Sequence, residues 1–469
     1  MNDSSQSEPE RSYRPPAPKP MTPVASLLRM IWQGEGNLLA LLPANAYRQM
    51  VGRLGYSRRG IVVVNDPALV RRVLIDEQGI FPKNDLMVSA LAPLVGDSIF
   101  VSSGPQWRRQ RAMIEPALSM MRVNKAYAAM QAAIDDYEVR LDTLASTGEA
   151  FSLDQAMSHL TADIICRSVF TTSLQSQMAR EVFDAFAHFE RSVAQVRPWQ
   201  LIVQPAFAPV AQAPDVLQAC ELIRHHLGEL VDSHRLDNDG RFNDIASAII
   251  EARDAESGNP FTRKELIDQL GVFFLAGHET SASVLTWVFF ILSVRPDLVR
   301  RMRREIEEVA GDGEITFEQI RELDFVRLVW RETLRLYPPI TFLPRVALEK
   351  TTFGPLTVRR GTMVMVSPWI MHRHRQLWRN PDHFDPERFS PGREHELVSG
   401  AYLPFGLGPR VCAGASFATI EGSLIIARLI RRYDFGTIDA TRVRPVARLT
   451  TRPARQIMIR VAAAGQAGG

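Results

Sequence analysis

The sequence predicts a mainly α-helical protein with a minor β region. Apolar residues recur at intervals of three and four through most of the chain, as in amphipathic helices. Runs of β-branched residues are short and few, the clearest being residues 61–64. The chain has 469 residues, 46% of them hydrophobic, which is enough for a substantial core. We therefore expect one large helical domain rather than a β-sandwich or a parallel α/β sheet.

The elements follow from periodicity and from the breaker residues between them. The four prolines within residues 197–214 predict a loop or short irregular helices, and residues 84–103 have a loop-like composition. Helices are expected near residues 67–74, 107–115, 124–146, 153–171, 176–195, 215–235, 243–255, 262–294, 296–310 and 323–337, with a helical apolar run at 415–431. Strands are expected at residues 61–64, 345–348, 352–358 and 362–366, and again in the segment 443–461.

Composition limits the domain organisation and the class of function. Residues 1–22 are polar and proline-rich, so we expect a disordered tail, a single domain over 23–461 and a flexible tail over 462–469. The net charge of +3 gives no case for nucleic-acid binding. No stretch of about 20 apolar residues is present, so we expect no transmembrane segment. Residues 38–42 are expected to pack on the core, with contact to a membrane surface as the alternative.

The three cysteines lie far apart and form no C-x-x-C pair. This pattern argues against a disulfide scaffold and a zinc ribbon, and favours the reducing cytoplasm. Cys412 stands out because it lies between Gly408 and Gly414, two residues after Arg410, and just before an apolar helix. Glycines permit close backbone approach, and a helix N-terminus favours a thiolate. The pattern predicts a thiolate presented to a metal; a buried, inert cysteine is the alternative.

Residues 405–414 resemble the haem-binding loop of the cytochrome P-450 family, F-x-x-G-x-R-x-C-x-G. The matching residues are Phe405, Gly408, Arg410, Cys412 and Gly414. The resemblance implies the cytochrome P-450 fold and haem b as the cofactor, with Cys412 as the axial ligand of its iron.

A second motif lies about 130 residues earlier, within the expected long helix. Gly277 in the middle of a helix costs up to about 1 kcal/mol relative to alanine, which indicates that something approaches the backbone there. The sequence Ala276 to Thr280 resembles the family motif A-G-x-[DE]-T. By that resemblance Thr280 and Glu279 are the catalytic residues, serving dioxygen activation and proton delivery. The alternative is a packed helix with a small residue at a crossing.

Glu332 and Arg335 share one face of a helix and, by themselves, would be read as a surface ion pair of little value. Together with Arg388 they resemble the family's E-x-x-R and P-E-R-F motifs. The resemblance implies a buried charged triad with a structural role.

Four side chains are expected to hold the haem by resemblance. Trp107 and Arg111 match the family's W-x-x-x-R, and Arg345 and Arg410 occupy positions of further arginines that bind the propionates. His372 is a further candidate for contact with the haem propionates, but a lone histidine more often has a structural role or is exposed. Arg108 and Arg109 point elsewhere on the same helix, and both contact with an acidic electron-transfer partner and an ordinary solvated surface remain open for them.

The resemblance implies a monooxygenase that inserts one atom of dioxygen into a hydrophobic organic substrate. No G-x-G-x-x-G follows a strand, so electrons are expected from a separate ferredoxin with its reductase, or from a flavodoxin-type donor. A peroxide-driven peroxygenase and a non-enzymatic haem sensor or carrier are the alternatives. The family's substrate positions fall in residues 84–103 and 188–214 and at the following side chains: Phe273, Phe274, Ala276, Ile340, Leu343 and Leu449.

Overall fold

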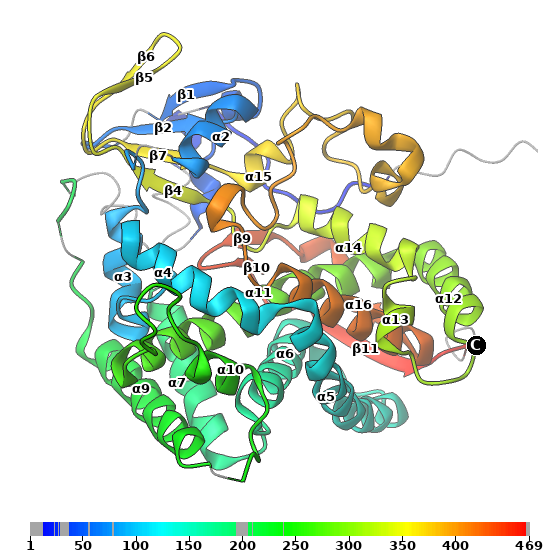
Figure 1. Ribbon diagram of the computed structural model, residues 1–469. Coiled ribbons are helices and arrows are strands. Elements are labelled where there is room, and N and C mark those ends of the chain that lie inside the picture. The colour runs from blue at the N-terminus through cyan, green and yellow to red at the C-terminus, as the bar shows by residue number, and fades with distance from the viewer. Residues whose placement is uncertain are drawn as a thin grey trace, which may run out of the picture.

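The structure is a computed structural model that describes residues 13–465, apart from positions 23, 27, 29–36, 55–56, 77–78, 194–204, 209 and 238. Figure 1 shows a helical body crossed by the long helix α11 (Arg263–Val294), with a smaller β-rich part beside it at the upper left. The mainly helical architecture with a minor β component confirms the predicted fold class.

The helices mostly fall where the periodicity predicts them. Local signals set their ends: Asp66 caps α2 through the Leu69 amide, Pro67 takes its first position, and Gly148 in the left-handed region ends α5. The helices of the body are α2 (Pro67–Ile75), α3 (Asp85–Val95), α4 (Gly104–Ile114), α5 (Met120–Thr147), α6 (Leu153–Phe170), α7 (Gln177–Val193), α9 (Pro214–Arg235), α10 (Ile245–Glu251), α12 (Pro296–Ala310), α13 (Phe317–Ile320), α14 (Asp324–Leu336), α15 (Pro368–Met371) and α16 (Ala415–Arg432).

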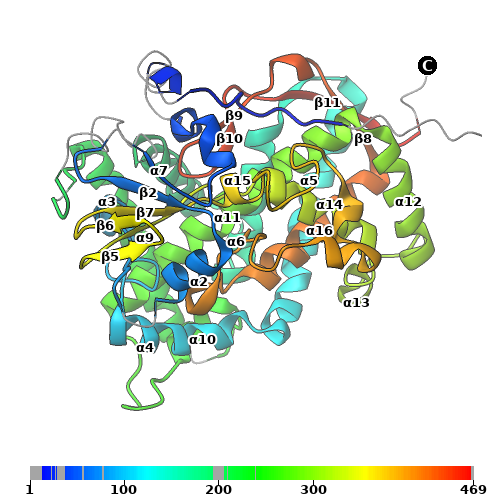
Figure 2. The ribbon, with the colours of Figure 1, turned by 90° about the horizontal axis from the view of Figure 1, so that it is seen from above.

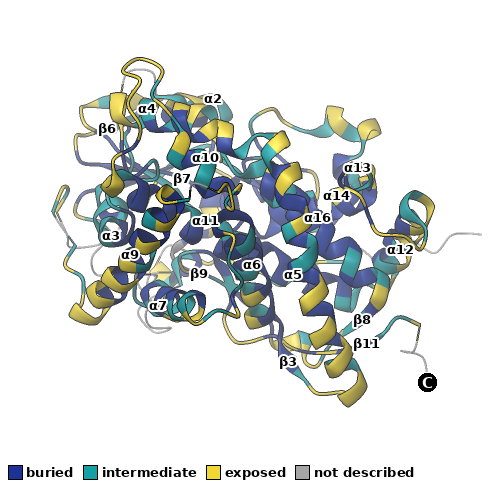
Figure 3. Cartoon of the chain, turned by 60° about the horizontal axis from the view of Figure 1, so that its bottom comes forward, coloured by how far each residue is buried: buried dark blue, intermediate teal, exposed yellow. Residues whose placement is uncertain are grey.

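Helix α11 is the axis of the molecule. It begins with a capping box in which Thr262 and Glu265 satisfy each other's backbone amides, and ends before Pro296. Figures 2 and 3 show it near the centre, among the surrounding helices, and Figure 3 colours it mainly dark blue, as buried. Within the described residues it is the one helix long and apolar enough to span a membrane, but 83% of its apolar window is buried in protein. It is therefore explained as a core helix.

In the part of the chain that the structure describes, the strands form four small sheets. The largest has the order β1-β2-β7-β4, in which β2 (Ile61–Val64) and β7 (Met363–Val366) are parallel, and β1 (Val51–Leu54) and β4 (Leu343–Val346) are antiparallel edges. Both inner strands are fully buried, as expected of continuous β-branched and apolar runs. The remaining strands are β3 (Phe151–Ser152), β5 (Thr351–Phe353), β6 (Leu356–Val358), β8 (Tyr433–Thr437), β9 (Pro445–Ala447), β10 (Thr451–Pro453) and β11 (Met458–Ala463).

The structure differs from the sequence-based expectations in three places. Residues 84–103 contain α3, which Asn84 caps through the Leu86 amide, rather than only loop. Strand β11 pairs with β8 as far as Ala463, so the segment expected as a C-terminal tail begins inside a sheet.

One expectation near the N-terminus is confirmed. Leu39 and Leu42 are buried, so the segment 38–42 packs on the core as expected.

The third difference concerns the N-terminal segment. Residues 13–22, expected to belong to a disordered tail, lie extended against the body of the protein (Figure 2). The Tyr337 hydroxyl donates a hydrogen bond to the Pro16 carbonyl at 2.7 Å, and the Phe384 amide donates to the Tyr13 carbonyl at 3.0 Å. Proline favours extended backbone, which fits a groove without needing its own hydrogen-bond ladder. Residues 1–12 and 466–469 of the expected tails lie outside the described residues.

Candidate active site

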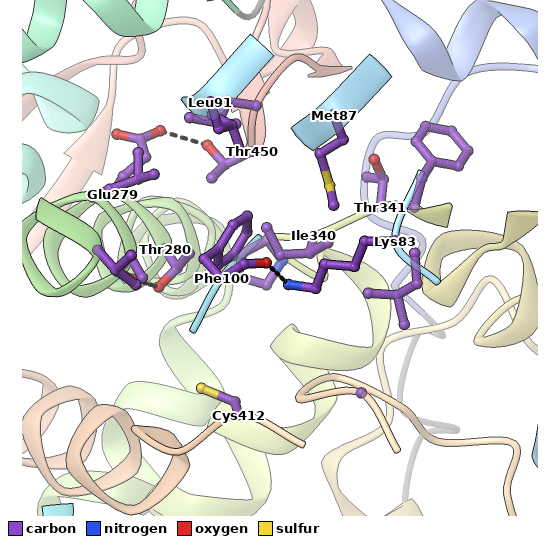
Figure 4. Close-up of a pocket in the computed structure, with 18 of the residues that line it drawn as sticks. Lys83, Met87, Leu91, Phe100, Glu279, Thr280, Ile340, Thr341, Cys412 and Thr450 are labelled. Atoms are coloured by element: carbon purple, nitrogen blue, oxygen red, sulfur yellow. Dashed lines mark hydrogen bonds between the residues drawn. The ribbon is translucent and has the colours of Figure 1, made fainter. Parts of the chain in front are cut away.

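A cavity of about 860 Å³ lies between α11 and the loop that carries Cys412. Its walls are mainly apolar and come from elements far apart in the sequence, including α3, α4, α11, β4 and the loop before β10. Figure 4 shows Cys412 on one side of this cavity and the α11 residues Glu279 and Thr280 on the opposite side. This volume and lining are typical of a site for a cofactor together with a small molecule.

The Cys412 loop is held by close packing. Gly408 has a φ of 77° and fits against α2, where an added Cβ would lie 2.9 Å from Ile75 Cγ1. The Cys412 amide donates a hydrogen bond to the Phe405 carbonyl at 2.9 Å, and α16 begins three residues later at Ala415. Gly414, in contrast, has a φ of −87° and needs no left-handed backbone.

Cys412 is accessible from the cavity although it lies deep in the protein. Burial raises the pKa of its thiol, while a hydrogen bond from the Gly414 amide and the charge of Arg111 act in the opposite direction. The other two described cysteines, Cys166 and Cys220, are buried in the core and do not line the cavity. Cys412 is thus the cysteine positioned to bind a metal in this cavity.

The predicted cofactor-binding cations meet at one edge of the cavity. Trp107, Arg111, Arg345 and Arg410 all line it, and the Arg410 guanidinium lies 4.4 Å from the centre of the Trp107 ring. Arg111 donates to the Val411 carbonyl at 2.8 Å and so braces the Cys412 loop. Burial lowers the pKa of both Arg345 and Arg410 to about 10.

Lys83 belongs to the same cationic group but was missed by sequence reasoning. Its ammonium donates to the Phe100 carbonyl and lies 4.0 Å from the centre of the Phe100 ring (Figure 4). Burial, followed by the nearby charges of Arg345 and Arg410, lowers its pKa well below the usual value. The only sequence signal was a lysine directly before the helix cap Asn84.

Within the described part of the chain, the cationic group lacks anionic partners in direct contact. None of Lys83, Arg345 and Arg410 forms an ion pair there, and Arg410 Nη1 is buried without a hydrogen-bond partner. Asp76 acts on Arg345 and Arg410 through its charge but pairs with neither. Cations that are removed from water without an ion-pair partner are costly, and carboxylates are the anions that arginine binds best. The site therefore fits a flat cofactor that carries carboxylates at this edge and a metal near Cys412.

Helix α11 forms the wall opposite Cys412. An added Cβ at Gly277 would lie 2.5 Å from Ile165 Cδ1, so the glycine is required by the packing of α6 against α11. The Thr280 hydroxyl donates to the Ala276 carbonyl at 2.7 Å within its own helix. Both Gly277 and Thr280 line the cavity, as predicted for the oxygen-binding segment.

Glu279 points to the side of α11 away from Cys412 (Figure 4). Arg452 of β10 donates to it through two nitrogens, with Nε to Oε1 at 2.6 Å. The Thr450 hydroxyl also donates to Oε1 at 2.5 Å. Sequence reasoning missed Thr450 and Arg452, because nothing in the β10 segment marks it as a neighbour of α11.

The predicted apolar substrate positions are mostly in place. Phe273, Ala276, Ile340, Leu343 and Leu449 line the cavity. The expected substrate region 188–214 is only partly described, because residues 194–204 and 209 lie outside the described residues.

Phe274 is the exception among the predicted substrate positions. It faces α7 instead, with its ring 5.4 Å from that of Phe186 and next to His278. Successive helical residues point about 100° apart, and the rotation of α11 turns Phe273 towards the cavity and Phe274 towards α7.

The predicted triad of Glu332, Arg335 and Arg388 is brought together and fully buried. Glu332 and Arg335 form a two-pronged pair with both N–O distances at 2.7 Å, and Arg388 Nε lies 3.7 Å from Glu332 Oε1. His372 lies beside them rather than in the cavity: its Nε2 accepts from the Leu403 amide at 2.8 Å. His372 thereby connects this network to the segment that leads into the Cys412 loop.

The arginines considered for a protein partner behave differently from each other. Arg109 is paired with Glu265 at 2.6 Å and with Asp254 at 3.8 Å, so its charge is neutralised within the protein. Arg108 is exposed to solvent. Of the two, only Arg108 presents its charge to an incoming acidic surface.

An accessible cysteine opposite a central helix, with cations at the cavity edge, is the arrangement expected of a haem-binding site. The comparisons with known proteins agree: the model of the cytochrome P-450 family matches residues 15–460, and the chain belongs to this family. It is a haem-binding oxidoreductase, a cytochrome P-450 monooxygenase.

Individual relatives support this assignment. The cyclooctat-9-en-7-ol 5-monooxygenase of Streptomyces melanosporofaciens is 31% identical over 444 residues, which cover 93% of each chain. The chloroplastic protein LUTEIN DEFICIENT 5 of Arabidopsis thaliana is 30% identical over 399 residues, covering 82% of this chain and 67% of that protein. The crystal structure of the cytochrome P-450DA haem domain shares the fold, with a TM-score of 0.80, 22% identity and coverage of 96% and 97%.

Proposed function

We propose that this monooxygenase binds haem through Cys412 as the axial ligand and oxidises a hydrophobic organic substrate with electrons from a separate protein donor. The observation that carries the proposal is the position of Cys412 in the cavity, with Thr280 of α11 on the opposite wall. The haem supplies the oxygen chemistry, and a thiolate ligand favours O–O cleavage.

The residues of the chain have separate tasks in this proposal. Lys83, Arg345 and Arg410 hold the haem carboxylates, and Arg111 keeps the Cys412 loop in place through the Val411 carbonyl. Thr280 lines the cavity, and Glu279, the preceding residue, holds a proton-transferring carboxylate on the side of α11 that faces Thr450. The apolar walls exclude water and orient the substrate.

Ligation by Cys412 is tested with Cys412→Ser. An alcohol is a harder and poorer ligand than a thiolate, so the reduced carbon monoxide complex is expected to lose the red-shifted Soret band of a thiolate-bound haem. Cys166→Ser serves as the control, since that buried cysteine does not line the cavity. Retention of the band in Cys412→Ser would refute the ligand assignment.

A hydrophobic substrate is supported by the apolar lining at Phe273, Ile340, Leu343 and Leu449. The relative from Streptomyces melanosporofaciens carries a name that places its action on cyclooctat-9-en-7-ol. Spectral titration with apolar alcohols, terpenoids, steroids and fatty acids is expected to shift the haem spin state for at least one apolar class. If only polar or charged compounds produce the shift, the proposed substrate class is wrong.

A separate electron donor is supported by the match of residues 15–460 to the cytochrome P-450 model, because these residues correspond to the haem-binding domain alone. We propose a ferredoxin with its reductase or a flavodoxin-type protein as donor, and a cytoplasmic location, to which the three free cysteines conform. Substrate-dependent dioxygen consumption with such a donor is the expected result. Product formed only with added hydrogen peroxide would instead favour the peroxygenase alternative.

A further inference from the structure

A group of buried charges lies behind α11, on the side of Glu279 away from Cys412. Arg452 reaches it from β10 and also donates to the Ser158 hydroxyl of α6 at 3.0 Å. Glu190 reaches it from α7, and its carboxyl group is hydrogen-bonded to that of Glu279. Glu279 is 1% exposed. Three elements distant in sequence, α7, α11 and β10, thus bring two carboxyl groups and one guanidinium group together.

The charge count of this group has a chemical consequence. Two ionised carboxylates in contact repel each other strongly inside a protein, and one arginine balances only one of them. Burial, followed by the charge of Glu279, raises the pKa of Glu190 well above its usual value. Burial alone would raise the pKa of Glu279 too, but Arg452 and the hydrogen bond from Glu190 lower it. The raised pKa of Glu190 and the lowered pKa of Glu279 both correspond to a proton on Glu190 and a negative charge on Glu279.

Other titratable groups also lie near this pair. His278 donates its Nδ1 proton to the Phe274 carbonyl, and burial lowers its pKa, so it is neutral. Burial likewise lowers the pKa of His159 on α6. Arg140 and Asp184 act on His159, and Asp154 acts on Arg452. The exposed Arg448 lowers the pKa of Glu190, but its effect is smaller than those of burial and of Glu279, which raise it.

We propose that Glu190 and Glu279 store one proton between them as a carboxyl–carboxylate pair, and that this pair supplies the proton that the reaction consumes in the cavity. Arg452 is the positioning residue, because its two-pronged contact keeps Glu279 ionised and aimed at Glu190. The inference deepens the proposed function, on which its catalytic part rests, by adding Glu190 to the path that ends at Glu279.

The proton movement is balanced without a further reagent. The proton of Glu190 passes along the hydrogen bond to the Glu279 carboxylate, and Glu190 becomes the carboxylate. The Thr450 hydroxyl, which donates to Glu279 Oε1 and lines the cavity, connects Glu279 to the cavity wall. Glu190 is partly exposed, so water restores its proton from the α7 side. Arg452 remains charged throughout.

The stored proton is measured by infrared difference spectroscopy on the haem-loaded protein. A protonated carboxyl gives a carbonyl-stretch band that shifts when water is replaced by D₂O. Glu190→Gln is expected to lose one such band. Glu279→Gln is expected to lose the same band, because Arg452 then pairs with Glu190 and ionises it. If the band persists in Glu279→Gln, Glu190 is an isolated buried acid and the pair is refuted.

Two controls keep the test specific. Glu421→Gln should remove a different protonated carboxyl, because burial raises the pKa of Glu421 to about 8 and its contact is Ser281 rather than an arginine. Arg452→Lys should retain the Glu190 band, whereas Arg452→Gln should alter it, since only the former restores a positive charge. These readings do not require turnover, so they stand even if the substrate or donor proposal fails.

The supply of the proton is tested separately by kinetics. Glu190→Gln is expected to lower product per electron several-fold, to raise hydrogen peroxide release and to enlarge the solvent isotope effect of turnover. Spin-state shift by substrate should remain unchanged, because Glu190 does not line the cavity. A variant that loses the infrared band but keeps wild-type coupling and isotope effect would refute the supply role.

Discussion

Two buried groups of acids and arginines in this protein have opposite compositions. The group of Glu332, Arg335 and Arg388 has one acid and two arginines, whereas the group of Glu279, Glu190 and Arg452 has two acids and one arginine. The first does not line the cavity, and the second contributes Glu279 to its wall.

The surplus charge is handled differently in the two groups. Arg335 uses all five of its N–H donors, two on Glu332 and three on the carbonyls of His372, Pro381 and His383. Such a saturated network locks backbone segments together and offers no group for exchange. Within the described residues the acid-rich group has no second cation hydrogen-bonded to it, and in our proposal a proton takes that place. Burial of an ion pair alone therefore does not distinguish a structural network from a reactive one. The two groups differ instead in whether acids or arginines are in excess.

The largest effect is expected from Glu332→Ala. This change leaves Arg335 and Arg388 as unpaired buried charges, and breaking such a pair costs about 3–5 kcal/mol. We expect little folded protein and poor haem uptake, measured by thermal unfolding and by haem content. The matched control is Arg442→Ala, which breaks an exposed Arg442–Asp439 pair of the same i, i+3 spacing and should leave both measurements unchanged. A stable, haem-loaded but inactive Glu332→Ala would contradict the structural role.

An intermediate, pH-dependent effect is expected from Glu421→Gln. Glu421 is fully buried on α16, Ser281 donates to its Oε2 at 2.5 Å, and no arginine is paired with it. Burial raises its pKa from 4.5 to about 8. The folded protein therefore keeps a proton that the unfolded chain releases, and stability falls as pH rises from about 4.5 to 8, by up to a few kcal/mol.

Chemical denaturation at several pH values measures this effect. The stability curve of Glu421→Gln should be flatter than that of the wild type between pH 5 and 8, because glutamine has no proton to retain. Parallel curves would show that Glu421 is ionised in the folded protein. This variant sharpens the comparison, since it represents a buried acid with no arginine at all.

The smallest effect on stability is expected from Thr280→Ala. The change removes one hydroxyl and its hydrogen bond to the Ala276 carbonyl, which should cost no more than about 1 kcal/mol. Product per electron should nevertheless fall and hydrogen peroxide release should rise, because Thr280 lines the cavity.

The control for Thr280 lies on the same helix. Thr286 donates the same i−4 bond, to the Ala282 carbonyl at 2.7 Å, but does not line the cavity. Thr286→Ala should change stability to a similar extent and leave coupling unchanged. Equal coupling in the wild type and both variants would remove Thr280 from oxygen activation.

Much of the fold and part of the site followed from local sequence. The 3.6-residue periodicity and the capping residues located α11 and its neighbours to within a few residues. The glycine–arginine–cysteine spacing around Cys412 located the loop, because its geometry depends on adjacent residues such as Gly408. Glu332 and Arg335 were paired correctly because they lie one turn apart on one helix. Local patterns sufficed wherever the interacting residues are neighbours in the chain.

Only the tertiary structure decided which distant residues meet. It brought Lys83 to Arg345 and Arg410, Arg452 to Glu279, and the N-terminal segment to Tyr337. It also turned Phe274 towards α7 and away from the cavity, a choice that depends on how α11 is rotated against its neighbours. The physical reason is that a charge or an aromatic ring carries no local signature of its partner. The energy that selects these contacts arises only when burial has removed the competing water.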